Sequence, residues 1–284
     1  MRRILSLVLA LVTLFALAGG RAEDTGWQNI LLLGGDARDM DRYDRSDSMI
    51  ILSVNRGEAL VKMTSIMRDT WVSFPGRSTP GKINAATVYG GPELAVATVN
   101  EYFGTDISDY VLVNMEDWVN IIDLLGGIDL EITESERRQI NSYAAGYTGA
   151  PYQGARTIDQ SGPVHLNGLL AMSYCRIRYI DSDYNRVMRQ QKVLLAMAEK
   201  AQDMEIGELS AIAGQVGDHI ATSLDDGEME ELMMAFMVMD VDQVEQFRVP
   251  ADGTFRDGMV NGVWRIDPDF EENRKLLREF IYGE

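Results

Sequence analysis

Residues 46–66 read SDSMIILSVNRGEALVKMTSI and contain the clearest strand signals of the chain. Four consecutive apolar residues occupy positions 49–52, so Ser48–Val54 is predicted to be a strand covered on both faces. Asn55-Arg56-Gly57-Glu58 is a turn signal, and Ala59–Ile66 is predicted to be a strand that returns beside the first. The segment therefore predicts a β-hairpin in the interior of a sheet.

Strand and helix patterns alternate along the rest of the chain. Further strands are expected at Asn29–Leu33, Tyr110–Asn114 and Gly127–Ile132. Helices are expected at Ala85–Tyr89, Pro92–Phe103, Glu116–Leu125, Asn167–Tyr174, Val187–Gln202 and Pro268–Ile281. Residues 133–165 lose this periodicity and are predicted to be a long surface excursion. The pattern indicates an α/β (α+β) sandwich, a central mixed sheet flanked by helices, in a single domain.

The N-terminus has the composition of an export signal. Arg2-Arg3 precedes an apolar run over residues 4–18 that ends in small residues. Residues 1–22 are therefore predicted to be a signal peptide or an N-terminal membrane anchor, since the run is at the lower limit for spanning a bilayer. Either alternative places the remainder outside the cytoplasm, secreted or anchored to the cell membrane.

The charge and the cysteine content exclude several classes of function. The net charge of -18 argues against nucleic acid as a partner and makes any local arginine cluster informative. The single cysteine, Cys175, rules out an internal disulfide and is expected to be a buried small residue rather than a nucleophile. Four methionines between positions 229 and 237 recur at helical spacing, which favours core packing over a metal site.

Five short blocks are rich in charged and polar residues, and four of them contain both aspartate and arginine. They are Gly34–Arg38 (GGDAR), Arg45–Asp47 (RSD), Ser65–Thr70 (SIMRDT), Lys82–Asn84 (KIN) and Tyr174–Gln191 (YCRIRYIDSDYNRVMRQQ). Aspartates can hold a divalent cation, and arginines offer forked donors that match phosphate oxygens. The combination suggests a site for a multiply charged phosphate bound with a metal ion.

Asp36 and Asp47 each adjoin a predicted strand and can meet at one edge of the sheet. Two converging carboxylates repel each other unless they share a proton or a cation, and Mg²⁺ (or Mn²⁺) is the expected cation. The alternative is that each aspartate caps a turn. Arg186 and Arg189 lie three residues apart on one helix face, with Gln190 beside them.

The five blocks, in this order, resemble the LytR-CpsA-Psr family, whose members attach glycopolymers to the bacterial cell wall. The likeness is specific from Trp27 to Gln202 and looser to the C-terminus. Residues 27–284 are therefore expected to form one catalytic domain, with a C-terminal extension from about residue 205.

The resemblance implies roles for individual residues. Catalysis is expected to depend on Asp47, Arg68, Arg178 and Arg186. Substrate binding is expected to involve Arg45, Lys82, Asn84, Arg176, Arg189 and Gln190, and the metal ligands are expected to be Asp36 and Asp47. Family members usually have proline where this chain has Met67, which leaves that loop less preorganised.

The resemblance also implies a reaction. Similar proteins transfer a sugar-1-phosphate from a polyprenyl-pyrophosphate-linked glycopolymer, of teichoic acid or capsule type, to a peptidoglycan hydroxyl and leave a phosphodiester. Two alternatives remain open: a pyrophosphatase that uses water as the acceptor, and a non-enzymatic lipid-binding regulatory protein. The membrane is then a partner through the lipid or the N-terminus.

A prenyl chain needs an apolar tunnel. The resemblance implies one that opens at the arginine cluster, and residues on 49–54, 110–115 and 194–197 could line it. An ordinary hydrophobic core would need the same residues. The helix expected at Val187–Gln202 is the predicted cover of the tunnel.

Overall fold

The structure, a computed structural model, describes residues 26–35, 43–55, 57–149, 152, 154–178, 180, 183–216, 220–225, 227–228 and 239–283. The predicted N-terminal signal or anchor, Asp36 and the methionine stripe lie outside these residues. Within them, no helix is both long enough and apolar enough to cross a membrane.

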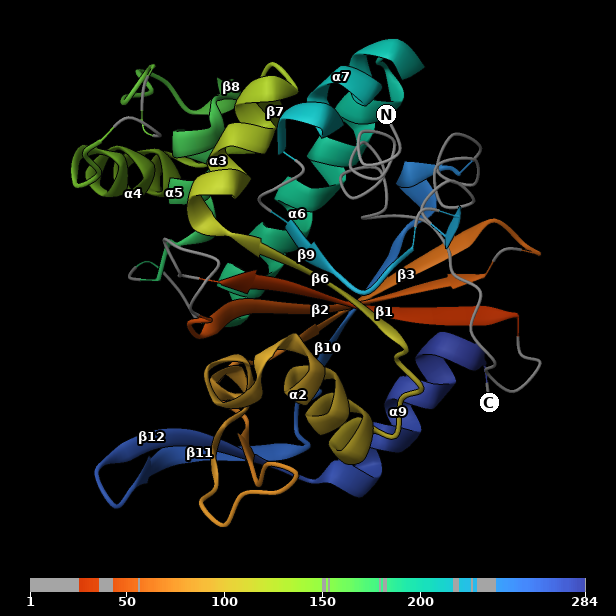
Figure 1. Ribbon diagram of the computed structural model, residues 1–284. Helices are drawn as coiled ribbons and strands as arrows, with labels where there is room; N and C mark the ends of the chain where they lie inside the picture. The colour runs from red at the N-terminus through yellow and green to blue at the C-terminus, as the bar shows by residue number, and fades with distance from the viewer. Residues whose placement is uncertain are drawn as a thin grey trace.

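A six-stranded mixed sheet forms the centre of the molecule (Figure 1). Its strands, in spatial order, are β10 (Glu245–Val249), β3 (Leu60–Ile66), β2 (Ser46–Asn55), β1 (Trp27–Gly35), β6 (Asp109–Asn114) and β9 (Ile220–Thr222). β1 and β6 are parallel, as are β3 and β10, whereas the other neighbours are antiparallel. The predicted fold class and the central hairpin are confirmed.

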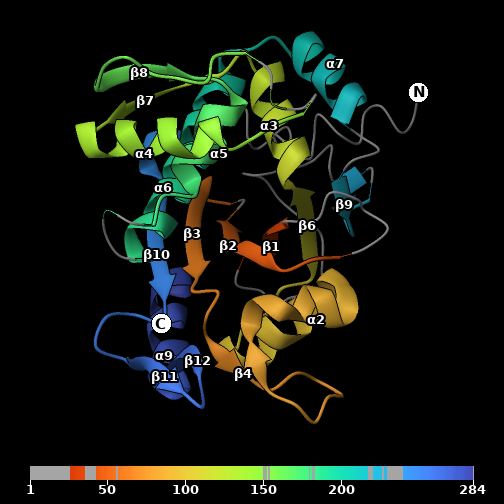
Figure 2. The same cartoon turned by 90° about the vertical axis from the view of Figure 1, so that its left-hand side faces the viewer.

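Helices cover both faces of the sheet. On one face lie α3 (Met115–Leu124), α4 (Glu134–Ala145), α5 (Gly168–Cys175), α6 (Asp183–Gln202) and α7 (Ile206–Val216), and on the other lie α2 (Ala86–Phe103) and α9 (Phe270–Tyr282). Figure 2 shows the same layers from the side. The η1 turn (Ile83–Ala85) precedes α2, and α2 kinks at Gly90 and Gly91.

β2 is apolar because its successive side chains pack into two different hydrophobic cores. Ile50, Leu52 and Val54 join the core beneath α3, α5 and α6, whereas Met49 and Ile51 join the core beneath α2 and α9. Successive side chains of a strand point to opposite faces, so a central strand covered twice must be apolar throughout. The prediction of a strand buried on both faces is confirmed.

The prediction for residues 133–165 is wrong in part. This segment contains α4 and leads into β8 (Gly162–Leu166), which pairs with β7 (Ile128–Ile132). α4 begins with a capping box, in which Thr133 and Glu136 satisfy each other's backbone N–H groups. Only Ile140 and Ala144 of α4 are buried, and this sparse apolar face hid the helix from a periodicity argument.

Several short elements lie after β3 and on either side of β10 in the sequence. β4 (Trp71–Val72) pairs with β5 (Gly81–Lys82), and the η3 turn (Val241–Gln243) precedes β10. Residues 255–268, for which no strand was predicted, form a hairpin of β11 (Phe255–Val260) and β12 (Val263–Pro268). Its turn carries Asn261 and Gly262, both with positive φ, which suits a tight hairpin connection.

Candidate active site

Asp47 and Arg68 meet because of the register of β2 and β3. The antiparallel pairing of Ile50 with Ser65, continued three residues past each, places Asp47 opposite Arg68. The Nη1 atom of Arg68 lies 2.6 Å from Oδ1 of Asp47. The two blocks RSD and SIMRDT are thus two halves of one ion pair at the end of the hairpin.

Two more arginines contact Asp47, one from the loop after α5 and one from α6. Nη2 of Arg178, in the loop after α5, lies 3.4 Å from Oδ2 of Asp47. Arg186, in the first turns of α6, donates from Nη1 to the backbone carbonyl of Asp47 at 2.9 Å and is only 2% exposed. The structure therefore brings three arginines from distant blocks together around one aspartate.

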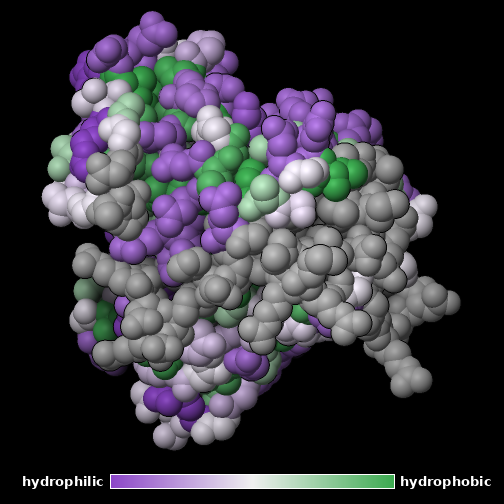
Figure 3. Space-filling model, turned by 45° about the horizontal axis from the view of Figure 1, so that its top comes forward, coloured by the Kyte–Doolittle hydropathy of each residue, from purple (hydrophilic) through white to green (hydrophobic). Residues whose placement is uncertain are grey.

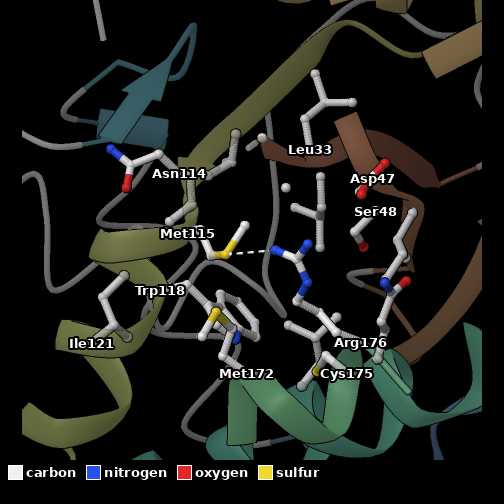
Figure 4. Close-up of a pocket in the computed structure, with 18 of the residues that line it drawn as sticks. Leu33, Asp47, Ser48, Asn114, Met115, Trp118, Ile121, Met172, Cys175 and Arg176 are labelled. Atoms are coloured by element: carbon white, nitrogen blue, oxygen red, sulfur yellow. Dashed lines mark hydrogen bonds between the residues drawn. The ribbon is translucent and has the colours of Figure 1, made fainter. Parts of the chain in front are cut away.

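A pocket opens beside this cluster and extends between the sheet and the helices α3, α5 and α6. Its volume is about 1030 Å³, including the open mouth. Most of its wall is apolar, from the strands (Leu32, Leu33, Ile50, Val111, Val113, Ile220) and the helices (Met115, Trp118, Ile121, Met172, Leu194, Met197). In Figure 4 the guanidinium of Arg176 points toward Met115 within this pocket, with Asp47 and Ser48 on the strand side.

The charged side chains that line the pocket carry a net positive charge. Its charged lining residues are Asp47, Arg176, Arg178 and Arg186, a net charge of +2 in a chain of net charge -18. Hydrophilic residues predominate on the clearly placed parts of the face shown in Figure 3, with hydrophobic groups among them. A positive mouth on an apolar pocket suits a ligand with an anionic head and a hydrocarbon tail.

Comparison with known proteins agrees with this geometry. The model of the LytR-CpsA-Psr family matches residues 14–279. This chain belongs to the LytR-CpsA-Psr family. The chain is 32% identical over 254 residues to the polyisoprenyl-teichoic acid–peptidoglycan teichoic acid transferase TagU of Halalkalibacterium halodurans, covering 88% of this chain and 77% of that protein. It is 35% identical over 256 residues to TagU of Oceanobacillus iheyensis, covering 87% and 73%.

Solved structures of family members have the same fold. TagT bound to LIIa-WTA superposes with a TM-score of 0.74 at 26% identity, covering 95% of this chain and 97% of that one. Bacillus subtilis TagV superposes with a TM-score of 0.70 at 25% identity, covering 91% and 98%. The family expected from the five sequence blocks is therefore confirmed by the sequence and the structural comparisons.

Some of the remaining residues expected from the LytR-CpsA-Psr resemblance line the pocket, and others support the segments around it. Gln190 and Arg176 line it, as do Arg178 and Arg186. Lys82 binds Asp69 at 2.5 Å, so it supports the loop that carries Arg68. The backbone N–H of Asn84 donates to the carbonyl of Arg68 at 3.4 Å, and the buried Oδ1 of Asn84 has no hydrogen-bond partner among the described residues.

Arg45 and Arg189 are placed away from the pocket lining. Arg45 is exposed, next to Ser46 at the start of β2. Arg189 is 4% exposed and donates from Nε to Glu136 at 2.9 Å and from Nη1 to the carbonyl of Ile177 at 3.4 Å. Arg189 therefore braces the loop before Arg178, a contact that sequence reasoning missed because Glu136 lies in the segment predicted to be an excursion.

Burial alone would raise the pKa of Glu136. The backbone N–H of Thr133 and the guanidinium of Arg189 outweigh burial and lower the pKa below its usual 4.5. A carboxyl with a lowered pKa in the folded protein stabilises that state above the pKa of the unfolded chain, and this stabilisation is lost as the pH falls through the folded-state value.

We expect Glu136→Gln to destabilise the protein at pH 7 by about 1 to 3 kcal/mol, because the buried Arg189 loses its charged partner. The difference in melting temperature between the variant and the wild type should shrink as the pH falls below about 4.5, since the wild-type carboxyl then becomes protonated. Glu131→Gln, the same change at an exposed strand position, is the control. An equal difference at every pH would contradict the ion-pair account.

Cys175 lines the pocket, and burial raises its pKa to about 12. Arg186 and Arg189 oppose this shift but do not overcome it. A thiol with so high a pKa is not ionised near neutral pH and is a poor nucleophile. Cys175 was expected to be buried, but it is only half-buried at the wall of the pocket.

The side chains around Asp47 show what kind of metal site this pocket could form. Among the described residues, no group of three or more His, Cys, Asp or Glu side chains could form a closed metal cage. The side chain of Asp47 is 35% exposed at the pocket, and Asp36 lies outside the described residues. One or two carboxylates completed by water and phosphate oxygens is the arrangement that Mg²⁺ prefers, so the residues present fit an ion completed by its substrate.

Proposed function

We propose that this protein transfers a phosphoglycosyl unit from a polyprenyl-pyrophosphate-linked glycopolymer to a hydroxyl of peptidoglycan. The observation that carries the proposal is the convergence of Arg68, Arg178 and Arg186 on Asp47 at the mouth of an apolar pocket. The names of the TagU relatives, polyisoprenyl-teichoic acid–peptidoglycan teichoic acid transferases, support the substrate class.

The proposed reaction is a displacement at phosphorus. The acceptor oxygen attacks the phosphorus that carries the sugar, the bond from this phosphorus to the bridging oxygen breaks, and polyprenyl phosphate leaves. The acceptor hydroxyl gives up its proton to solvent water, and the product is a phosphodiester between the sugar and the acceptor. Guanidinium groups fixed around the pyrophosphate stabilise the charge that develops on the bridging oxygen without reorganising.

Arg178 and Arg186 fit this role because both line the pocket. Arg68 fits a supporting role, since it fixes the Asp47 side chain from the neighbouring strand. Asp47, together with Asp36, would hold a Mg²⁺ or Mn²⁺ ion, which would neutralise charge on the pyrophosphate oxygens. A neutralising ion also accounts for an aspartate at a site built for an anion.

The apolar part of the pocket is proposed to hold the prenyl chain. Each methylene removed from water contributes about 0.8 kcal/mol, so a long chain gains much from such a wall. α6 covers the pocket as expected through Leu194 and Met197, and α3 and α5 share the cover. The protein is proposed to act outside the cytoplasm, where its acceptor lies, with the membrane as the source of the lipid.

We expect Leu194→Trp to obstruct the apolar end of the pocket. The buried Leu194 leaves little room for a larger ring, so substrates with long prenyl chains should bind at least tenfold more weakly, a change of about 1.4 kcal/mol. Short-chain pyrophosphate analogues should be almost unaffected. Affinities of both chain lengths for the wild type and the variant give the comparison.

Lys192→Trp, the same bulky side chain at an exposed position of α6, is the control for the added ring. Equal losses for both chain lengths in Leu194→Trp would mean that the tail does not occupy this pocket.

A transfer assay separates the proposed function from hydrolysis. Purified protein is incubated with a polyprenyl-pyrophosphate-linked glycan and peptidoglycan, and the products are identified by mass spectrometry. The proposal predicts a glycan joined to peptidoglycan by a phosphodiester. Free glycan phosphate as the sole product, at the same rate with and without peptidoglycan, would instead support the pyrophosphatase alternative.

A further inference from the structure

A second pocket lies between the β11–β12 hairpin and the start of α6, outside the arginine-lined pocket. Its volume is about 940 Å³, including the open mouth. Its wall combines aromatic and acidic side chains with one arginine (Met67, Asp69, Tyr184, Arg248, Asp252, Phe255, Asp257, Trp264, Ile266). None of its lining residues was assigned a catalytic, substrate-binding or metal-binding role from the sequence, although Met67, Asp69 and Tyr184 lie within two of the five sequence blocks.

The register of the hairpin builds one wall of this second pocket. Asp257 pairs with Ile266, and Met259 pairs with Trp264, so Phe255, Asp257, Trp264 and Ile266 share one face. These four residues are the hairpin's contribution to the lining. Trp264 is 46% exposed, which is unusual for a tryptophan that serves only packing.

Arg248 forms the floor of the pocket. It is 6% exposed, and its guanidinium lies 4.9 Å from the centre of the Tyr184 ring and 5.7 Å from that of the Phe255 ring. It also donates to Asp252 and to the carbonyl of Pro250. Its Nε is buried and has no hydrogen-bond partner among the described residues. Because Asp252 and the carbonyl of Pro250 hold the guanidinium, Arg248 fixes the shape of the pocket floor and offers little free positive charge to a ligand.

The second pocket adjoins the proposed reaction centre through the chain itself. Met67 and Asp69 line it, whereas Arg68 between them binds Asp47 at 2.6 Å. On α6, Tyr184 lines the second pocket and Arg186, two residues later, lines the first.

The hairpin is also fixed directly to the loop that carries Arg68. The backbone N–H of Ile266 donates to the carbonyl of Asp69 at 3.0 Å. A ligand held against the hairpin would therefore lie beside the segment that places Arg68 against Asp47.

The charges of the two pockets differ in sign. The second pocket has three carboxylates, of Asp69, Asp252 and Asp257, and one arginine. Even with Asp69 paired to Lys82, this wall disfavours a polyanionic glycopolymer or a pyrophosphate. Carboxylates accept hydrogen bonds from hydroxyl groups, and exposed aromatic rings offer apolar faces to the C–H faces of a ring. Together they fit a neutral, hydroxyl-rich sugar chain.

We propose that the second pocket binds the acceptor of the transfer, an uncharged N-acetylhexosamine chain, with one sugar ring against Trp264. This inference rests on the proposed function, because it assigns the acceptor of that reaction. In this arrangement the arginine-lined pocket takes the anionic donor, the carboxylate-lined pocket takes the neutral acceptor, and the Arg68–Asp69 loop lies between the two.

The test uses a tetramer of N-acetylglucosamine as a neutral probe, with binding to the full protein measured by calorimetry. Trp264→Ala should weaken binding roughly tenfold, and Asp257→Asn should also weaken it, because the first loses a ring contact and the second an anionic acceptor. Both side chains are exposed, so folding should be preserved. Val263→Ala is the control, since Val263 is exposed on the opposite face of the same hairpin.

In the transfer assay, Trp264→Ala should raise the KM for the acceptor and leave both the kcat at saturating acceptor and the affinity for the donor unchanged. Binding of the tetramer does not depend on turnover, so failure of this inference and failure of the proposed function can be told apart. Wild-type affinity for the tetramer in Trp264→Ala, or a loss of donor affinity instead, would overturn the assignment.

Discussion

Asp47→Ala should reduce turnover of the polyprenyl-pyrophosphate substrate by at least about a thousandfold. The change removes the carboxylate that binds Arg68 and Arg178, and it removes the proposed ligand of the metal ion. Release of the lipid phosphate from a labelled donor measures the loss.

The fold should survive this change, because the Asp47 side chain is 35% exposed and its backbone carbonyl, which Arg186 binds, remains. Circular dichroism and the melting temperature test this directly. Asp44→Ala removes the same charge three residues away at an exposed position and should leave turnover almost unchanged. Near-wild-type activity of Asp47→Ala in excess EDTA would contradict a mechanism that depends on this carboxylate and a metal ion.

Arg178→Ala should lower kcat by about 100- to 1000-fold, the usual effect of removing one preorganised donor from a developing oxyanion. Arg178 lines the pocket and is 37% exposed, so its loss should affect turnover far more than stability. Arg178→Lys should recover little of the activity, because a compact ammonium group cannot replace the planar fork of a guanidinium. Steady-state kinetics with a saturating donor measure the effect.

Arg138→Ala is the matched control for this prediction. Arg138 is also an arginine bound to a carboxylate, that of Glu134, but its side chain is 71% exposed on α4. An equal loss of turnover in both variants would mean that the total positive charge, rather than the placement of Arg178, supports the reaction.

Local sequence rules were sufficient for the central hairpin, whereas the ion pair of Asp47 with Arg68 became clear only from the strand register. The apolar run of β2 predicted that this strand is buried on both faces. The register of β2 against β3 places Asp47 opposite Arg68. The approach of Arg178 and Arg186 is different, because it depends on how α6 packs over the sheet. For those two residues the family resemblance supplied what the spacing of residues could not.

The features that sequence reasoning missed depend on long-range contacts. Glu136 lies on a helix with few apolar residues, and its contact with Arg189 spans 53 residues. The β11–β12 hairpin has exposed apolar residues and no clear alternation, so its sequence does not show the pattern of a half-buried strand. Its role as a pocket wall appears only when the register of its two strands and the position of Arg248 are known together.

The most direct test of the account is a crystal structure of the protein with a polyprenyl pyrophosphate bound. The proposed function predicts pyrophosphate oxygens within hydrogen-bonding distance of Arg178 and Arg186, next to Asp47, and continuous density for the prenyl chain between the sheet and α6, beside Leu194. A prenyl chain bound elsewhere on the protein, with the pyrophosphate away from these arginines, would contradict the account.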